Sequence, residues 1–321
     1  MMKKIALIYM GGTFGCVGEP LAPLAADIFL PKLQHLLPLD CETTCFVATE
    51  IKDSSACTAA DWLNLVAQIQ ALQQQGWQRF IVIHGTDTLS YAAAVLSHFI
   101  TNDACVVLTG SQYPLLTIDG EDTRDFSDAL DNLNLAYKAI EQHEHGVYLA
   151  FHQHIVHGRS ALKQHSTELD AFAGIDAKQP LLPSQSLHIS TDFIEKAHTF
   201  NCISMMMQPI STQQHLQNLQ QLLQNPPHCL ILQGFGTANL AVDGALLSLF
   251  QQLYNEGCVI ILTTQVPFSA IDQHYAINSW LADAPVLLSN CYGHADLYAK
   301  ALKMYLQYDR VEQWFDHWQD K

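Results

Sequence analysis

The sequence predicts an α/β fold with a larger N-terminal domain on a mainly parallel sheet, a linker, and a smaller C-terminal α/β domain. Its 321 residues exceed what one small core needs. Short apolar runs alternate with amphipathic stretches, which is typical of parallel strands joined by helices. The alternation weakens over 178–210, where three prolines fall. We therefore predict domains at 1–180 and 211–321, joined by a linker at 181–210.

Short runs that are apolar at nearly every position predict strands buried on both faces. In chain order, the predicted strands are Ile5–Tyr9, Arg79–His84, Ala104–Thr109, Gly146–Phe151, Cys229–Gln233 and Cys258–Thr263.

Amphipathic stretches between these runs predict helices. They are Ala59–Gln75, Ser90–Ile100, Thr123–Gln142, Thr212–Gln224, Ala241–Asn255, Ile271–Ala282 and Ala295–Tyr308. The first has clear end signals: Thr58 as N-cap, Asp61 three residues later as a capping box, and Gly76 where a C-cap belongs.

Composition narrows the classes of partner. The formal net charge of −16 disfavours nucleic acid and anionic lipid, so we expect neither a nucleic-acid partner nor a membrane. The apolar run after Lys4 stops at Gly11, too early for a signal peptide, and the nine cysteines form no disulfide framework. We therefore expect a cytoplasmic protein. The CxxxC pair Cys41 and Cys45 has no second pair near it, which disfavours zinc.

Two predicted strands are followed directly by polar turns. After the first come Gly11, Gly12 and Thr13, where a hydroxyl could act as a nucleophile beside backbone N–H groups. The alternative is a phosphate-binding turn, but the spacing is GGxxG and not GxGxxG. After the second strand come Thr86 and Asp87 in the run HGTDT, which could instead only cap the next helix.

Further polar segments lie at the same predicted sheet edge or near it. The third strand ends in TGSQ at 109–112, and Asp53, Ser54 and Ser55 precede the capped helix. Downstream, Lys163 ends the segment GRSALK. A lysine beside hydroxyl and carboxylate groups could lower a threonine pKa or shuttle protons, although a lone lysine is most often a solvated surface residue.

In this order, GGT, DSS, HGTDT, TGSQ and GRxxxK resemble the motifs of bacterial type I, cytoplasmic L-asparaginases over nearly the whole chain. The resemblance implies an asparaginase-like fold in which Thr13 attacks the side-chain amide carbon. It implies that Thr86, Asp87 and Lys163 handle protons. The residues that would bind the substrate, a small amino-acid amide, are Asp53, Ser54, Ser55, Thr86 and Asp87. The resemblance implies that no metal or organic cofactor is used.

The resemblance also implies a homodimer or homotetramer, in which a segment such as that holding Thr237 and Asn239 reaches the neighbouring subunit's site. The GxG spacing of this segment is equally consistent with an ordinary strand–helix turn. One departure concerns the loop after Thr13, where Leu21 stands at the position of a family tyrosine that assists the nucleophile. Two functions follow. The first is hydrolysis of L-asparagine to aspartate and ammonia, and the alternative is a catalytically weak or non-hydrolytic homologue that binds an amino acid or regulates a partner.

Overall fold

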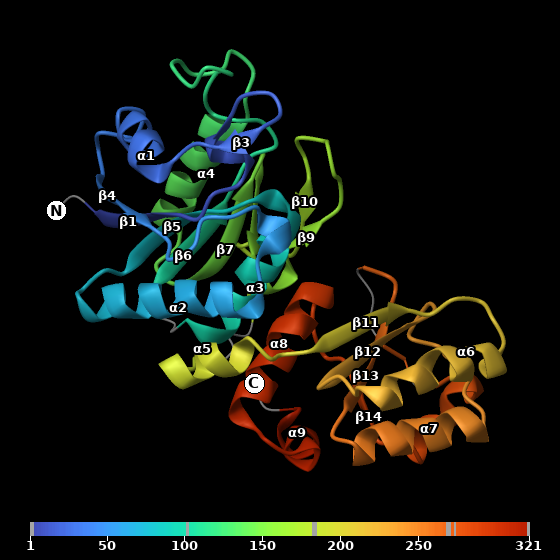
Figure 1. Ribbon diagram of the computed structural model, residues 1–321. Helices are drawn as coiled ribbons and strands as arrows, with labels where there is room; N and C mark the ends of the chain where they lie inside the picture. Colours follow the sequence, from blue (N-terminus) through green and yellow to red (C-terminus); the bar gives the residue numbers. More distant parts are fainter. Residues whose placement is uncertain (1–2, 101–102, 182–184, 268–270, 273, 320–321) are drawn as a thin grey trace. The chain divides into compact units, whose positions relative to one another are not determined.

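The computed structural model describes residues 3–100, 103–181, 185–267, 271–272 and 274–319. The chain divides into two compact units between His198 and Thr199 (Figure 1). The segment 181–210 that the sequence predicted as a linker is largely part of these units, apart from 182–184, which lie outside the described residues. Helix α5 (Thr191–Ala197) packs on helix α2 of the first unit, and strand β11 (Cys202–Met206) pairs in the sheet of the second.

The N-terminal unit is built on a sheet of strand order β4-β1-β5-β6-β7-β8, in which all neighbours are parallel except β7 and β8. Its strands are β1 (Lys4–Tyr9), β4 (Glu42–Val47), β5 (Arg79–Ile83), β6 (Cys105–Thr109), β7 (Gly146–Phe151) and β8 (His154–His157). The central strands β1, β5 and β6 are mostly apolar and, apart from Lys4 and Arg79, buried, because helices cover both faces.

Helices α1 (Ala26–Gln34) and α4 (Ala129–Gln142) lie on one face of this sheet, and α2 (Ala59–Gln74) and α3 (Leu89–Phe99) lie on the other (Figure 1). Two short hairpins come after strands of this sheet in the chain, the first after β1 and the second after β8. They are β2 (Cys16–Val17) with β3 (Ala22–Pro23), and β9 (Leu162–Lys163) with β10 (Phe172–Ala173). Single 3₁₀ turns occupy Thr13–Gly15, Ser54–Ala56, Thr86–Thr88 and Gly158–Ser160.

The C-terminal unit holds a parallel sheet of order β11-β12-β13-β14. The remaining strands are β12 (Cys229–Gly234), β13 (Val259–Thr264) and β14 (Val286–Leu288). One face packs on α6 (Thr212–Leu219) and α7 (Gly244–Asn255), and the other on α8 (His294–Gln307) and α9 (Val311–His317). The mainly parallel α/β architecture predicted from the sequence is confirmed.

All six predicted strands form, with ends that differ by at most one residue. Four predicted helices are wrong in part. The helix expected over Thr212–Gln224 ends at Leu219 and continues as a 3₁₀ helix to Gln224, and the helix expected from Ala241 begins at Gly244. The helix expected from Thr123 begins at Ala129, because Thr123 bridges to Leu116 and the carboxylate of Asp128 binds another turn. The helix expected at 271–282 is a 3₁₀ helix over Ala276–Ala282, and residue 273 lies outside the described residues.

The end signals of α2 are confirmed. Asp61 accepts hydrogen bonds from the backbone N–H and the hydroxyl of Thr58 at 2.7 and 2.8 Å, and Gly76 has φ +91°. Among the described residues, the helices lack the length and apolar character that crossing a bilayer requires.

Candidate active site

The candidate site lies where the strand order of the N-terminal sheet reverses. The chain passes from β1 outward to β4 and then returns to β5 on the other side of β1. Beyond their first turns, the connection from β1 leads to α1 on one face of the sheet and the connection from β5 leads to α3 on the other, which opens a crevice at the carboxyl ends of these strands. Tyr9, Ile83 and Thr109 end their strands in register, so the turns that follow them start side by side.

The turns after β1 and β5 meet through backbone, without side chains between them. Gly12 has φ +88°, and a Cβ atom at this position would lie 2.4 Å from the Cα of Gly85. A Cβ atom at Gly85 would in turn lie 2.5 Å from the Oγ of Ser54. At position 12, only glycine allows both the positive φ and the close approach to the backbone of Gly85. Thr13 and Thr86, the next residues along, are consequently brought to the same crevice.

Lys163 reaches this crevice from the β9–β10 hairpin. Its Nζ donates to the hydroxyl of Thr86 at 2.9 Å and to Oδ1 of Asp87 at 2.7 Å. The lysine side chain is 18% exposed and that of Asp87 is 62% exposed, so the ion pair lies at the mouth of the crevice and is partly screened by water. The solvated-surface alternative for Lys163 does not hold, because its ammonium is committed to two specific acceptors.

A cavity of about 360 Å³ joins these groups. Its described lining residues are Gly12, Thr13, Cys16, Leu21, Pro23, Asp53, Ser54, Gly85, Thr86, Asp87, Gln112, Lys163 and Ser166. Six of the seven residues singled out from the sequence line it. Ser55 is the exception, since its N–H and hydroxyl both bind Oδ1 of Asp53, at 2.8 and 2.6 Å.

The Ser54 segment is locked to the β5 turn. The hydroxyl of Thr88 donates to the carbonyl oxygen of Ser54 at 2.7 Å, which joins the two 3₁₀ turns. The hydroxyl and the N–H of Ser55 hold the pKa of Asp53 below its usual range, the hydroxyl having the larger effect. Asp53 is therefore a carboxylate at neutral pH. It lines the cavity from the segment before α2, whereas Lys163 lines it from the β9–β10 hairpin.

Behind the β5 turn lies a buried histidine. The Nε1–H of Trp62 donates to Nε2 of His84 at 3.2 Å, and Nδ1 of His84 lies 2.8 Å from the carbonyl oxygen of Gly85. The indole donor assigns the imidazole proton to Nδ1, which then donates to Gly85. Burial lowers the pKa of His84 to about 4, so the ring is neutral at pH 7. His84 thus anchors the turn and is not a base at the crevice.

The lining residues that were not predicted as site residues from the sequence include Cys16, Gln112 and Ser166. Cys16 belongs to the first hairpin, Gln112 to the turn after β6, and Ser166 to the loop 164–171 that follows Lys163. Of these three, only Gln112 carried a signal, as part of the polar TGSQ run. The loop 164–171 has no periodic pattern from which the position of Ser166 could be predicted.

With this geometry in place, comparison with known proteins decides the family. Residues 4–192 match the family described as "Asparaginase, N-terminal". The chain belongs to the asparaginase family. Relatives within or near the family include L-asparaginase 1 of Escherichia coli K12, which is 27% identical over 95% of this chain and 91% of its own. A 60 kDa lysophospholipase of Mus musculus is 26% identical over 89% of this chain and 55% of its own.

Solved structures support the asparaginase fold. L-asparaginase I from Vibrio cholerae O1 superposes with a TM-score of 0.77 at 24% identity, covering 100% of this chain and 98% of that chain. A probable cytoplasmic L-asparaginase from Campylobacter jejuni gives a TM-score of 0.76 at 17% identity, covering 99% and 100% of the two chains. The full coverage shows that both units share the fold of these asparaginases.

Proposed function

We propose that this member of the asparaginase family hydrolyses L-asparagine to aspartate and ammonia, with Thr13 as the nucleophile. The supporting observation is the hydrogen-bonded set Lys163–Thr86 and Lys163–Asp87 in the cavity that Thr13 also lines. A threonine hydroxyl is inert at its free pKa and needs such neighbours to lose its proton. This set favours hydrolysis over a non-hydrolytic binder, which needs no such set.

The proposed reaction has two halves. In the first, the Oγ of Thr13 attacks the side-chain amide carbon, its proton passes through the hydroxyl of Thr86 to the departing nitrogen, and ammonia leaves. In the second, water attacks the resulting ester, and Thr13 regains its proton. Lys163 donates to the oxygen of Thr86, which makes the hydroxyl proton of Thr86 easier to give up. Gly11 and Gly12 have positive φ, and Gly12 lines the cavity, so backbone N–H groups of this turn are our candidates for stabilising the oxyanion.

The charges of the cavity fit a small zwitterion. Asp53 and Asp87 supply carboxylates that match an α-ammonium group. The hydroxyl of Ser54 and the ammonium of Lys163 supply donors that match an α-carboxylate. We further propose that the enzyme acts in the cytoplasm, as the type I enzymes it resembles do. Cell fractionation that finds the protein elsewhere would contradict this location.

Ammonia release from L-asparagine tests the function. Thr13→Ala should lower kcat by at least about a thousandfold, and Lys163→Met by about a hundredfold or more, with losses in the double variant that are not additive. Thr13→Ser, which keeps a hydroxyl, should retain more activity than Thr13→Ala.

Lys138→Met is the matched control for Lys163→Met, since Lys138 is exposed on α4 and its loss should leave kcat unchanged. Turnover by Thr13→Ala at the wild-type rate would refute the nucleophile. Wild-type protein that binds L-asparagine but releases no ammonia would instead support the non-hydrolytic homologue.

A further inference from the structure

The first turn of α4 is fastened to the polar turn that follows β6. Asp128, which is 7% exposed, accepts the backbone N–H of Gln112 at 3.1 and 2.9 Å with its two oxygens, and the N–H of Tyr113 at 2.9 Å. These bonds explain why the helix starts late, at Ala129. The Asp128 carboxylate is therefore a buried acceptor that fixes the direction in which residue 112 leaves the strand.

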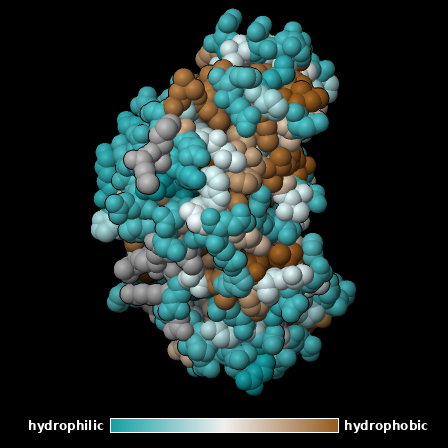
Figure 2. Space-filling model, turned by 90° about the vertical axis from the view of Figure 1, so that its left-hand side faces the viewer, coloured by the Kyte–Doolittle hydropathy of each residue, from teal (hydrophilic) through white to brown (hydrophobic). Residues whose placement is uncertain are grey.

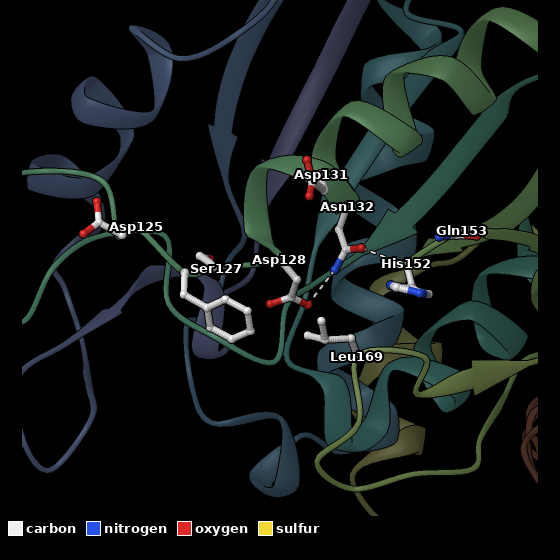
Figure 3. A pocket seen from close by; sticks show the side chains of 9 residues that line it. Asp125, Ser127, Asp128, Asp131, Asn132, His152, Gln153 and Leu169 are labelled. Carbon is white, nitrogen blue, oxygen red and sulfur yellow. Dashed lines mark hydrogen bonds between the residues drawn. The ribbon is translucent and has the colours of Figure 1, made fainter.

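Asn132, fully buried one helical turn later, completes the attachment. Its Nδ2 donates to the carbonyl oxygen of Gly110 at 3.0 Å and to Oδ2 of Asp128 at 2.8 Å, and its Oδ1 accepts the N–H of His152 at 2.7 Å. Figure 3 shows Asp128 and Asn132 turned toward each other beside a second cavity that they line. We call Asp128 and Asn132 the α4 clamp.

The side chain of Gln112 carries this attachment across to the candidate active site. Its Nε2 donates to the carbonyl oxygens of Ser166 at 3.3 Å and Glu168 at 2.9 Å. Both belong to the loop 164–171, between β9 and β10. Gln112 and Ser166 also line the active-site cavity, so the two backbone bonds hold one of its walls.

Lys163 is held by a different set of contacts. It pairs with Phe172 in the β9–β10 hairpin and donates to Thr86 and Asp87. Loss of the Gln112 bonds therefore frees the loop that carries Ser166 without releasing the ammonium from Thr86. Under the proposed function, this wall would contact bound substrate, whereas the ammonium of Lys163 would act on the proton path as well as on the substrate carboxylate.

We propose that Asp128 and Gln112 are positioning residues for substrate binding: the α4 clamp orients Gln112, which holds the 164–171 loop as a wall of the active-site cavity. This inference rests on the proposed function for its substrate. It assigns the clamp to binding and not to the chemical step, and it gives the polar residues of the α4 first turn a role beyond helix capping.

Two variants break the connection from Asp128 through Gln112 to the 164–171 loop at different places. Asp128→Asn puts an N–H donor against the donors of Gln112, Tyr113 or Asn132 in either orientation of the new amide. Gln112→Met keeps the length of the side chain and removes the donor to the loop. Each variant should raise KM for L-asparagine by about tenfold and leave kcat within about threefold, because uniform binding is lost.

Asp131→Asn is the matched control. Asp131 lies in the same first turn of α4 and is exposed, so the variant removes the same charge and leaves the clamp intact. Its KM and kcat should equal those of the wild type. A merely structural role for the clamp predicts another pattern, with a lower melting temperature and a lower kcat at unchanged KM, and that result would overturn the proposal.

Amide hydrogen exchange tests, without any substrate, whether the α4 clamp and Gln112 hold the 164–171 loop. The amides of Gln164 and His165 donate to the carbonyl oxygen of Ala171 at 2.8 and 3.3 Å, and they should exchange faster in Gln112→Met and Asp128→Asn but not in Asp131→Asn. Should wild-type protein release no ammonia, the proposed function fails and exchange alone decides the clamp. Unchanged exchange in Gln112→Met overturns the clamp, even where Asp128→Asn does not fold.

Discussion

Leu21 is an apolar side chain on the wall of a cavity otherwise rich in hydroxyls and charges. It precedes β3 in the hairpin after Thr13 and is 49% exposed. The resemblance to type I asparaginases places a tyrosine here. Tyr113, in the turn after β6, does not supply the missing hydroxyl: it packs edge-to-face on Phe126 at 4.9 Å and is not among the described residues that line the cavity.

Leu21→Tyr should therefore raise kcat for L-asparagine, because it adds a hydroxyl to the proton path of Thr13. A well-placed acid–base group is worth about 10²–10⁴-fold, and an engineered one should give a gain of about tenfold or more. Leu21→Phe is the control, since it adds the ring without the hydroxyl and should give no gain. Equal turnover in Leu21→Tyr and the wild type would show that the site works without this group.

At the scale of an element, the end of β5 depends on helix α2 through His84. The folded state holds His84 neutral, with a pKa of about 4, whereas the unfolded chain has a value near 6.5. A lowered folded pKa means that this stabilisation is present above about pH 6.5 and is lost as the pH falls toward 4. The shift corresponds to about 3 kcal/mol of unfolding free energy.

Denaturant titrations at several pH values check this prediction. The free energy of unfolding should fall by about 3 kcal/mol more between pH 6.5 and 4 in the wild type than in His84→Gln, which cannot take up a proton. His35→Gln, on a histidine in an exposed position after α1, is the control and should keep the wild-type slope. Equal slopes for wild type and His84→Gln would mean that protonation of His84 does not lower the free energy of unfolding.

What the sequence predicted at this scale depended on local pattern. The strand that ends at Ile83 was predictable because every residue after Arg79 is apolar, and the start of α2 because Thr58 and Asp61 form a capping box. Helix α1 was missed because Pro31 interrupts its pattern, and β4 because its polar residues give a weak apolar signal.

The site was predictable where polar residues directly follow buried strands, as Thr13 and Thr86 do. It was not predictable where long-range contacts decide. Gln112 reaches Ser166 and Glu168, which are 54 and 56 residues away, and no local pattern encodes that contact. Ser55 shows the converse, since a motif residue spends its hydroxyl on Asp53.

At the scale of the whole molecule, the chain exposes apolar side chains that a partner could cover. Figure 2 shows apolar areas among hydrophilic ones on the face it presents. Phe126 and Ile118 are 63% and 51% exposed. With the family resemblance, this supports the proposal of a homodimer or homotetramer, in which the segment of Thr237 and Asn239 reaches a neighbouring site.

Light scattering at micromolar protein should therefore give the mass of at least a dimer of the 35.8 kDa chain. Specific activity should fall on dilution once subunits separate, because part of each site would leave with the partner. A monomer at micromolar concentration with full activity would contradict both the assembly and the role of Thr237 and Asn239.

The backbone contact between Gly12 and Gly85 has a consequence for how this enzyme can change. Because two main chains meet there, the spacing between Thr13 and Thr86 is set without any side chain as spacer. Apolar residues of the sheet can therefore be exchanged for others of similar volume, and stability will respond before the reaction geometry does. Natural or designed variants can therefore differ at many interior residues and still keep the hydroxyls of Thr13 and Thr86 at the same spacing.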